Sequence, residues 1–266
     1  MRVLITGAAR AIGAATASEL IAAGHEVVAT ARNVELLADV PATQRLALDV
    51  TSDASVAAAL EAAGPLDAIV NNAAIGGSGP LESYPLDRLR AMLETNTFGA
   101  LRMIQAVAPS WRERGSGVIV NVSSVQGRVG TPLGGSYAAS KWALEAMSET
   151  LHYELGHFGI RIVIIEPGYI APGMKANEEH LGDAVYDELR RQWAGTDSKV
   201  VGVRPGPELV GRAIVAAITD PGTPMRVPRS PADWSSWPKV RRSSTWAVSP
   251  RARAPRRCRP RRSCGA

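Results

Sequence analysis

Cysteine and histidine are scarce in this chain of 266 residues. Its two cysteines, Cys258 and Cys264, both lie near the C-terminus, and its four histidines are scattered without the spacing of metal ligands. A disulfide framework therefore cannot hold the fold together, and unpaired thiols are the favoured interpretation. A reducing cytoplasm is the simplest setting for such a chain, and we expect no metal.

Long apolar runs are also missing. No stretch of about eighteen apolar residues occurs, so we expect no membrane-spanning helix. The first apolar segment begins at residue 2, without a basic region or a cleavage site before it, which argues against a secretory signal. Hydrophobic residues make up 45% of the chain, which is ordinary for a globular core, and the length suits one large domain.

Acidic residues almost disappear toward the C-terminus. Residues 226–266 contain twelve Lys or Arg and a single acid, Asp233, for a net charge of +11. Residues 1–225 contain 18 basic and 24 acidic residues, for a net charge of −6. The body of the protein is therefore mildly acidic, and the basic character of the whole chain comes from its last segment.

Residues 229–266 are rich in Pro, Ser and Arg and show no apolar period. Such a segment cannot bury enough surface to fold alone, so we expect a disordered basic tail; a replaced, for example frame-shifted, C-terminus would have the same composition. The tail could bind nucleic acid or anionic surfaces non-specifically. Trp234, Trp237 and Trp246 could stack on bases, but their spacing indicates nothing organised, and we expect no specific nucleic-acid partner.

Residues 1–228 alternate between apolar β-type segments and helical segments. Strands are predicted at 3–6, 26–30, 45–48, 68–71, 117–122, 161–165 and 225–227, and helices at roughly 12–23, 53–62, 86–95, 98–113, 135–156, 177–193 and 206–219. This alternation predicts an α/β fold, a Rossmann-like doubly wound parallel sheet with helices on both faces in a single domain. Ligands of such sheets bind at the carboxyl ends of the strands.

A glycine-containing turn at residues 6–13 follows the first predicted strand and precedes the first predicted helix. Glycines permit tight turning and close approach of the backbone, and the helix N-terminus presents free N–H groups to a pyrophosphate. The order strand, turn, helix is the one that dinucleotide binding requires. The segment therefore predicts a dinucleotide cradle that includes Gly7 and Gly13.

Tyr137 and Lys141 stand four residues apart, with Ser124 thirteen residues before the tyrosine. On a helix, residues i and i+4 share a face, so a phenol would lie beside an ammonium group. A nearby positive charge lowers a tyrosine pKa toward the range of an acid–base catalyst. Taken alone, the pair is also compatible with a solvated surface contact, and the rest of the chain decides between the two.

Together these segments resemble the short-chain dehydrogenase/reductase family. In chain order its motifs correspond to the glycine turn 6–13, the segment 71–74, the helix asparagine Asn96, the serine strand 118–124, the pair Tyr137 and Lys141, and the turn Pro167-Gly168, over residues 1 to about 228. Ala11 and Ala74 replace glycines of the family pattern. Pro172 stands where the family often has a threonine, which puts the anchoring of the nicotinamide in doubt.

The resemblance implies an oxidoreductase that interconverts a ketone or aldehyde and an alcohol by hydride transfer. Tyr137 would exchange the proton with the substrate oxygen, Lys141 would lower the pKa of Tyr137 and hold the nicotinamide ribose, and Asn96 would hold a water connected to Lys141. Ser124 would hydrogen-bond the substrate oxygen, and we favour it over Ser123, which would point the opposite way on a strand. A non-enzymatic NADP-binding sensor or scaffold is the alternative on the same fold, and epimerisation or dehydration is a second.

For the cofactor, NADP is favoured over NAD. An NAD site usually has an acid near the end of the second strand to hold the ribose hydroxyl, but Arg32 stands there and no acid occurs before Glu35. Arg10 and Arg32 suit a phosphate dianion, although two surface arginines would look the same. With the resemblance, the expected cofactor-binding residues are Gly7, Arg10, Ile12, Gly13, Arg32, Asp49, Val50, Asn72, Ala73, Tyr137, Lys141, Pro167, Gly168 and Ile170.

The substrate itself is not specified by the sequence. Residues 171–204, with Met174, Tyr186 and Trp193, interrupt the alternation, and the resemblance implies that they cover the substrate; a surface helix pair is the other interpretation. With the apolar loop 125–130 they favour a small carbonyl compound with a hydrophobic body. Relatives use the helices at 98–113 and 135–156 for a two-fold interface, so we expect a homodimer or homotetramer.

Overall fold

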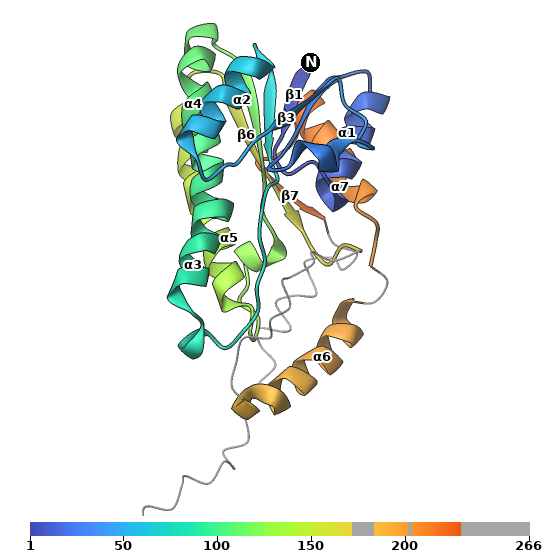
Figure 1. The fold of residues 1–266 in the computed structure, drawn as a ribbon, viewed down its shortest axis with the longest axis vertical. Helices are drawn as coiled ribbons and strands as arrows, with labels where there is room; N and C mark the ends of the chain where they lie inside the picture. Colours follow the sequence, from blue (N-terminus) through green and yellow to red (C-terminus); the bar gives the residue numbers. More distant parts are fainter. Residues whose placement is uncertain (172–183, 202–203, 230–266) are drawn as a thin grey trace, which may run out of the picture. The chain divides into compact units, whose positions relative to one another are not determined.

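The computed structural model describes residues 1–171, 184–201 and 204–229. Its centre is a parallel sheet of seven strands in the order β3-β2-β1-β4-β5-β6-β7 (Figure 1). The strands are β1 (Arg2–Ile5), β2 (Glu26–Ala31), β3 (Gln44–Ala47), β4 (Ala68–Asn71), β5 (Gly117–Val122), β6 (Ile160–Pro167) and β7 (Arg226–Arg229). Every pair of neighbours is parallel, as expected for strands joined by helical crossovers.

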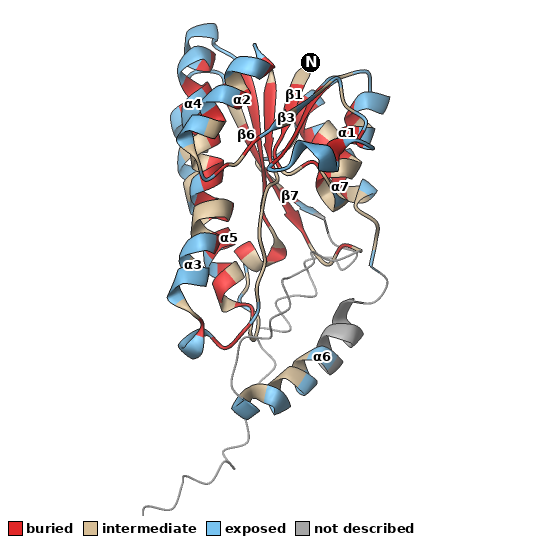
Figure 2. Cartoon of the chain, viewed as in Figure 1, coloured by how far each residue is buried: buried red, intermediate tan, exposed pale blue. Residues whose placement is uncertain are grey.

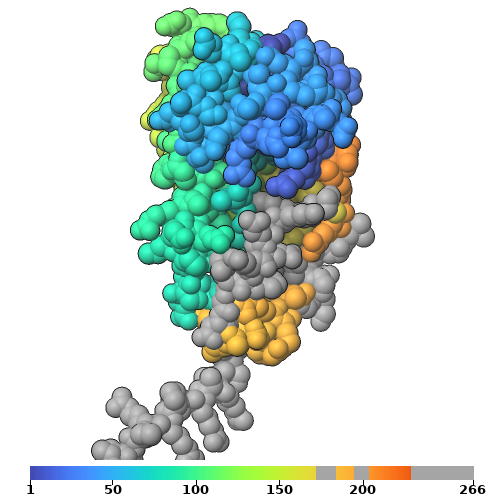
Figure 3. Space-filling view, in the orientation of Figure 1, coloured from blue at the N-terminus to red at the C-terminus, as the bar shows by residue number. Residues whose placement is uncertain are grey.

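Helices cover both faces of this sheet. On one face lie α1 (Ala11–Ala22) and α7 (Glu208–Thr219); on the other lie α2 (Asp53–Ala63), α4 (Gly99–Arg114) and α5 (Gly135–Gly156). Helix α3 (Leu86–Leu93) packs against α5. In the space-filling view the orange residues of α7 border the blue N-terminal residues (Figure 3), in agreement with the packing of α7 on α1.

The strands alternate between the two cores, as a period of two residues requires. Val3 and Ile5 of β1 belong to the core beneath α1 and α7, whereas Leu4 belongs to the core beneath α2 and α4. Both faces are covered, so the central strands β1, β4, β5 and β6 are apolar at most positions. Figure 2 shows the buried residues concentrated in the sheet and on the inner sides of its helices.

Five short helical turns lie between the longer elements that the structure describes. They are the 3-10 turns η1 (Val34–Leu37), η2 (Leu81–Ser83), η4 (Val125–Gly127) and η5 (Ala184–Tyr186), and the π-helical turn η3 (Glu94–Phe98). The π turn connects α3 to α4 without a break, and Asn96 lies at its middle. A π turn inside a longer helix commonly marks a functional site.

The strand order reverses direction between β1 and β4. The chain leaves β1 toward β2 on one side and later returns to β4 on the other, so a crevice opens at the carboxyl ends of these two strands. Gly7 follows β1 and Asn72 follows β4 at this point. The predicted dinucleotide cradle therefore lies where an open α/β sheet binds ligands.

The predicted fold class is confirmed, and all seven predicted strands are present within a few residues. One helix was predicted with the wrong bounds. Of the predicted 177–193, residues 177–183 lie outside the described structure, and α6 spans Asp187–Val201 after the turn η5. The sequence in this region is charged and only weakly periodic, so the first and last residues of the helix could not be predicted well. The π turn was not predicted, because it interrupts a helical pattern by only one residue.

Several expectations concern residues outside those that the structure describes. These are residues 172–183, which include Pro172 and Met174, residues 202–203, and the basic tail from residue 230 with its three tryptophans and two cysteines. The chain divides into a compact unit of Met1–Ala232 and a second unit, Asp233–Ala266, of which nothing is described. Among the described helices, none combines the length and the apolar character that crossing a membrane would need.

Candidate active site

A cavity of about 1420 Å³ lies at the carboxyl ends of the strands. It extends from the glycine turn after β1, past the ends of β2 and β4, to the turn after β5 and the first turn of α5. Of the predicted site residues, those that line it are Gly7, Arg10, Ile12, Arg32, Asp49, Val50, Asn72, Ala73, Ser124, Tyr137, Lys141, Pro167, Gly168 and Ile170. One cavity thus collects residues from segments far apart in the sequence.

Thr6 and Asn72 connect the ends of β1 and β4. The Thr6 hydroxyl accepts hydrogen bonds from the backbone N–H groups of Asn72 and Ala73, both at 2.9 Å. In return the Asn72 side-chain amide donates to the carbonyl oxygens of Thr6 and Gly7, both at 3.0 Å. These four bonds fix the floor of the crevice, and Thr6 is a residue whose role was not predicted.

Glycine is required at two positions of the turn after β1. Gly7 has φ +66°, and a Cβ there would lie 2.9 Å from the Cα of Ala73. A Cβ on Gly13 would lie 2.4 Å from the carbonyl oxygen of Gly7. Gly13 does not line the cavity; it lies buried beneath the turn and lets α1 pack closely against it.

Ala11 adopts φ 47°, in the left-handed region where an L-residue costs roughly 1–2 kcal/mol. This is the position at which the motif has glycine, and the backbone conformation is the physical reason for that preference. Ala11 lines the cavity and begins α1. The substitution therefore adds a methyl group and backbone strain to the cradle.

Arg10, Arg32 and Asp49 occupy the end of the cavity next to β2 and β3. Both arginines are exposed, and neither forms a hydrogen bond or ion pair within the part of the chain that the structure describes. Hydrogen bonds from the Thr51 backbone and hydroxyl to the Asp49 carboxylate lower its pKa, and the positive charge of Arg32 adds to this. Two guanidinium groups beside one carboxylate leave this end of the cavity with positive charge.

Tyr137, Lys141 and Ser124 come together at the other end. The first turn of α5 carries Tyr137, and Lys141 lies one turn later on the same face. The Tyr137 and Ser124 hydroxyls share a hydrogen bond. The Lys141 Nζ lies 5.7 Å from the centre of the Tyr137 ring and donates to the carbonyl oxygen of Val122 at 2.8 Å.

The pKa values of this pair differ from the expectation that Lys141 lowers the pKa of Tyr137. Desolvation raises the pKa of Tyr137 above its usual value, and the bond with Ser124 offsets only part of the increase. Burial also lowers the pKa of Lys141 to about 8. In the protein alone, therefore, burial of the two groups outweighs the attraction between a phenolate and an ammonium ion.

Ser124 and Ser123 both line the cavity after β5, but their hydroxyls have different contacts. Ser124 lines the cavity, and its Oγ accepts a bond from the Gln126 N–H at 3.2 Å, which caps the turn η4. The Ser123 Oγ is buried beside Gly127 and has no hydrogen-bond partner in the described structure. Of the two serines, Ser124 is the one whose hydroxyl meets Tyr137.

Asn96 lies behind the cavity rather than on its surface. Its side-chain Oδ1 accepts from the Ile75 N–H at 2.8 Å, and its Nδ2 donates to the Ile75 carbonyl oxygen at 2.9 Å and to the Ser140 Oγ at 3.0 Å. The Ser140 hydroxyl in turn donates to the Tyr137 carbonyl oxygen at 2.8 Å. Asn96 thus connects the π turn to the first turn of α5, and its predicted contact with a water stays a prediction.

Other residues that line the cavity were not predicted. They include Asn33, Thr51, the glycine-rich segment 76–79, Leu133 and Tyr169. Gln126, Arg190 and Arg204 also line the cavity, and they belong to the loop 125–130 and the segment 171–204 that were expected near the substrate. Leu133 has φ 62°, and its carbonyl oxygen accepts from the Gly79 N–H at 2.8 Å, which joins two loops over the cavity. The glycines after Asn72 were the one sequence signal that could have indicated a cavity wall there.

The donor set of this cavity fits a nicotinamide dinucleotide. The backbone at Gly7 approaches the cavity where a side chain would not fit, which suits a pyrophosphate at the start of α1. Arg10 and Arg32 supply cationic donors, and Tyr137 and Lys141 supply polar groups at the far end. A chain of donors along one crevice is what such an elongated anion requires.

Comparison with known proteins identifies the family. The short chain dehydrogenase family model matches residues 1–181. The chain belongs to this family of oxidoreductases, whose seven-stranded parallel sheet it shares. The cavity at the carboxyl ends of the strands, which collects residues from most of the six sequence motifs, is therefore the candidate active site of an oxidoreductase of this family.

Relatives of known name and structure agree with this assignment. Human retinol dehydrogenase 8 is 34% identical over 253 residues, which cover 84% of this chain and 79% of that protein. A short chain dehydrogenase from Burkholderia cenocepacia in complex with NADP superposes with a TM-score of 0.73 at 28% identity and covers 96% of this chain and 98% of its own. NAD⁺-bound xylitol dehydrogenase superposes with a TM-score of 0.73 at 25% identity and covers 87% and 98%. The family thus includes structures with either dinucleotide.

Proposed function

We propose that this protein interconverts a carbonyl compound and an alcohol with NADP(H), using Tyr137 as the acid and base. The observation that carries the proposal is the meeting of Tyr137, Ser124 and Lys141 at one end of the dinucleotide-shaped cavity. A phenol and a hydroxyl that share a hydrogen bond suit a substrate oxygen between them. A sensor or scaffold would not need this set of groups, and this chain retains all of them.

NADP(H), when bound in this cavity, would supply or accept the hydride at the carbonyl carbon. In the direction of reduction, Ser124 donates a hydrogen bond to the substrate oxygen and orients it, and Tyr137 transfers its proton to that oxygen as negative charge develops. Lys141 holds a positive charge close to Tyr137, which favours the phenolate after the transfer. Asn96 supports the site by fixing Ser140, whose hydroxyl binds the Tyr137 backbone.

NADP rather than NAD is the proposed cofactor. Arg10 and Arg32 form no hydrogen bond or ion pair among the described residues, and both line the cavity at the end that contains Asp49. A guanidinium pair binds a ribose phosphate with charge-assisted hydrogen bonds, whereas a neutral ribose leaves both charges uncompensated. The relative from Burkholderia cenocepacia was solved with NADP, which supports the proposal by analogy only.

A hydrophobic carbonyl compound is the proposed class of substrate. Around Ser124 the cavity is lined by Val125, Pro132, Leu133 and Tyr169, which offer an apolar surface beside a few polar groups, as ligand pockets usually do. The name of retinol dehydrogenase 8 is consistent with such a substrate. We expect a ketone or aldehyde with an apolar body rather than a sugar.

We also propose a homodimer formed through α4 and α5. Phe98, at the start of α4, and Trp142 of α5 are 47% and 52% exposed, and a shallow apolar hollow with Leu101 and Met147 lies between the two helices. Exposed apolar side chains that gather on adjacent helices indicate an interface. Solution mass, measured by light scattering with Trp142→Glu as the disrupting variant, tests this part of the proposal.

Oxidation of NADPH in the presence of ketones and aldehydes tests the proposed reaction. The panel should contain long-chain and aromatic carbonyl compounds together with polar sugars, and each compound should be measured with NADPH and with NADH. Turnover of an apolar carbonyl compound with NADPH is the expected result. If NADPH binds but no compound is reduced and no alcohol is oxidised, the sensor interpretation takes the place of the enzyme.

A further inference from the structure

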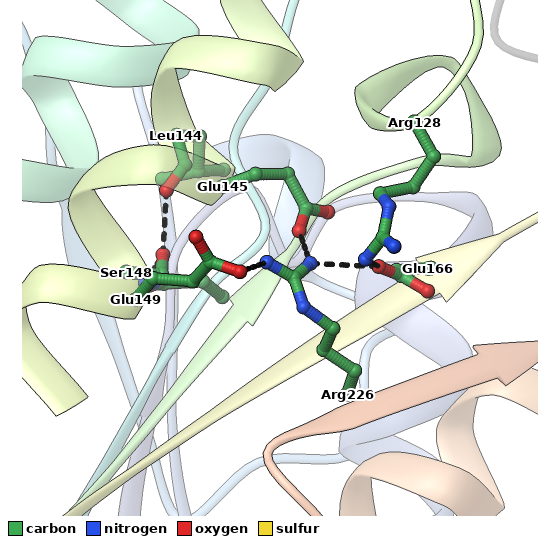
Figure 4. Close-up of polar contacts among 8 residues, drawn as sticks. Arg128, Leu144, Glu145, Ser148, Glu149, Glu166 and Arg226 are labelled. Carbon is green, nitrogen blue, oxygen red and sulfur yellow. Dashed lines mark hydrogen bonds and ion pairs between the residues drawn. The ribbon is translucent and has the colours of Figure 1, made fainter.

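A cluster of charged side chains, of which two carboxylates are buried, lies next to the turn that follows Ser124. Arg226 of β7 forms ion pairs with three carboxylates, Glu145 and Glu149 of α5 and Glu166 of β6 (Figure 4). The side chains of Glu145 and Glu166 are only 5% and 4% exposed. Buried carboxylates stay charged only where cations and hydrogen bonds compensate them. Glu145 therefore depends on Arg226, and Glu166 depends on Arg226 together with Arg128.

Arg226 thereby joins two elements that carry the proposed active site. Glu145 follows Lys141 by four residues and Tyr137 by eight, so the three side chains lie along one face of α5. Glu166 belongs to the end of β6, directly before Pro167 and Gly168, which line the cavity. A single guanidinium group of β7 thus fixes α5 relative to β6.

The turn after Ser124 contacts both carboxylates from the other side. A Cβ on Gly127 would lie 2.9 Å from the Glu145 Cγ, so the backbone of the turn rests on that side chain. Arg128, the next residue, lies 3.4 Å from the Glu166 carboxylate. Arg226 lies 3.0 Å from the same Glu166 oxygen, which closes a ring of contacts from the turn through Glu145, Arg226, Glu166 and Arg128 back to the turn.

We propose that Arg226 is a positioning residue that sets the location of Ser124 relative to Tyr137. It acts through Glu145 and Glu166, because these carboxylates contact the turn that carries Ser124 and the elements on either side of it. The inference rests on the proposed function, in which both hydroxyls act on one substrate oxygen. A displacement of about 1 Å between such groups can cost on the order of 10²-fold in rate.

The experiment must distinguish the positioning role of Arg226 from a general contribution to the stability of the fold. Arg161 of β6 offers a matched control, because it too is an arginine of the last strands that binds several oxygens. Its guanidinium donates to the carbonyl oxygens of Ala217, Ile218 and Asp220 at the end of α7. Arg161→Met should therefore lower the melting temperature without moving the serine turn.

The full-length protein with Arg226→Met, Arg226→Lys and Arg161→Met should be compared with the parent at saturating NADPH. For Arg226→Met we expect kcat to fall by about 10²-fold while the Kd of NADPH, measured by fluorescence, stays within about twofold. The kcat of Arg226→Lys should lie between those of Arg226→Met and the parent, because an ammonium group does not bridge carboxylates as a planar guanidinium group does. Arg161→Met should keep kcat within about threefold. Equal losses of kcat in Arg226→Met and Arg161→Met would overturn the proposal.

Chemical rescue gives a readout that a loss of stability would not produce. The Arg226 side chain is 20% exposed, so free guanidinium ions should reach the gap in Arg226→Ala and restore part of its kcat, whereas sodium at the same ionic strength should not. Rescue by sodium alone, or no rescue while the variant remains folded, counts against the positioning role.

Amide hydrogen exchange tests the inference even if the parent reduces no carbonyl compound, which would refute the proposed function instead. The N–H groups of Gly127 and Arg128 are bonded within the turn, at 2.8 and 3.0 Å. These two amides should exchange at least about tenfold faster in Arg226→Lys, and in Arg226→Met if it folds, because the turn opens locally. The exchange rates of the amides in β1 should stay unchanged. Unchanged exchange in Arg226→Lys, or the same acceleration in Arg161→Met, would overturn the inference.

Discussion

Lys141 donates a hydrogen bond of 2.8 Å to the carbonyl oxygen of Val122, the last residue of β5. The end of β5 is thus bonded to a side chain of α5, the helix that also carries Tyr137. Ser124 follows Val122 by two residues. This bond satisfies a carbonyl group that leaves the sheet at its carboxyl edge. It also holds Lys141 in a buried position, where desolvation lowers its pKa to about 8.

The buried Lys141 should make stability depend on pH in a defined direction. Its pKa is about 10.5 when exposed and about 8 in the folded protein, so between these values the unfolded chain binds the additional proton. The contribution of Lys141 to the free energy of unfolding should therefore rise from pH 8 to pH 10.5, by roughly 3 kcal/mol over the whole range. Urea denaturation of the parent and of Lys141→Met at several pH values measures it.

The difference between parent and variant isolates this group, because all other titrating residues are shared. In Lys141→Met the rise should be absent. A parent and a variant whose free energies of unfolding change in parallel above pH 8 would show that Lys141 keeps an ordinary pKa in the folded protein.

Tyr137→Phe tests the proposed acid. Phenylalanine keeps the ring and removes only the hydroxyl that bonds Ser124, so NADPH binding should stay nearly unchanged. We expect turnover to fall by about 10²–10⁴, the usual contribution of a positioned proton donor. Tyr153→Phe is a matched control, because Tyr153 lies on the same helix and is 76% exposed. Turnover of Tyr137→Phe within tenfold of the parent would exclude the assigned role.

Arg32→Asp tests the choice of cofactor. The change removes a cation that has no partner among the described residues and places a carboxylate where a ribose phosphate would bind, so it should repel NADP and accept the hydroxyls of NAD. The ratio of kcat/KM for NADPH to that for NADH should drop by at least about tenfold. Arg112→Asp, on α4 beside Phe158, is the control. An unchanged ratio would mean that the phosphate binds elsewhere.

The sequence predicted the fold and most of the cavity because those depend on local patterns. Apolar strands, glycine turns and an i, i+4 pair can be recognised from the spacing of residues in the sequence. Parallel strands then bring their carboxyl ends to one edge of the sheet. The contacts of Arg226 were not predictable in the same way, since they join α5, β6 and β7 across 81 and 60 positions of the chain. The sequence also predicted a lowered pKa for Tyr137, whereas burial raises it in the structure. The spacing of Tyr137 and Lys141 says nothing about how deeply they are buried.

The sequence predicted which helices and strands are present better than it predicted the residues at which they begin and end. Strand β7 runs through Arg229 and pairs with β6 up to Pro167, two residues beyond the predicted end at 227. Asn96 carries a motif, but its contacts with Ile75 and Ser140 depend on the π turn. Such irregular turns arise from packing between helices, not from any sequence period.

Shortening the chain tests whether the basic tail contributes to the fold. A chain that ends at Arg229 keeps every described helix and strand, with 20 basic and 24 acidic residues. A chain that ends at Gly222 loses β7 and with it Arg226, which leaves Glu145 and Glu166 buried with less compensating charge. An end at Val227 would divide β7 and is therefore a poorer choice.

We expect the chain that ends at Arg229 to retain the melting temperature, the activity and the solution mass of the parent, because residues 230–266 have the composition of a segment without a core. The chain that ends at Gly222 should melt at a lower temperature and lose activity, since leaving a buried charge unpaired costs about 3–5 kcal/mol. Thermal melts, NADPH oxidation and light scattering of both chains measure these outcomes. If ending the chain at Arg229 also abolishes activity or changes the oligomer, residues 230–266 are part of the folded protein and the tail is not dispensable.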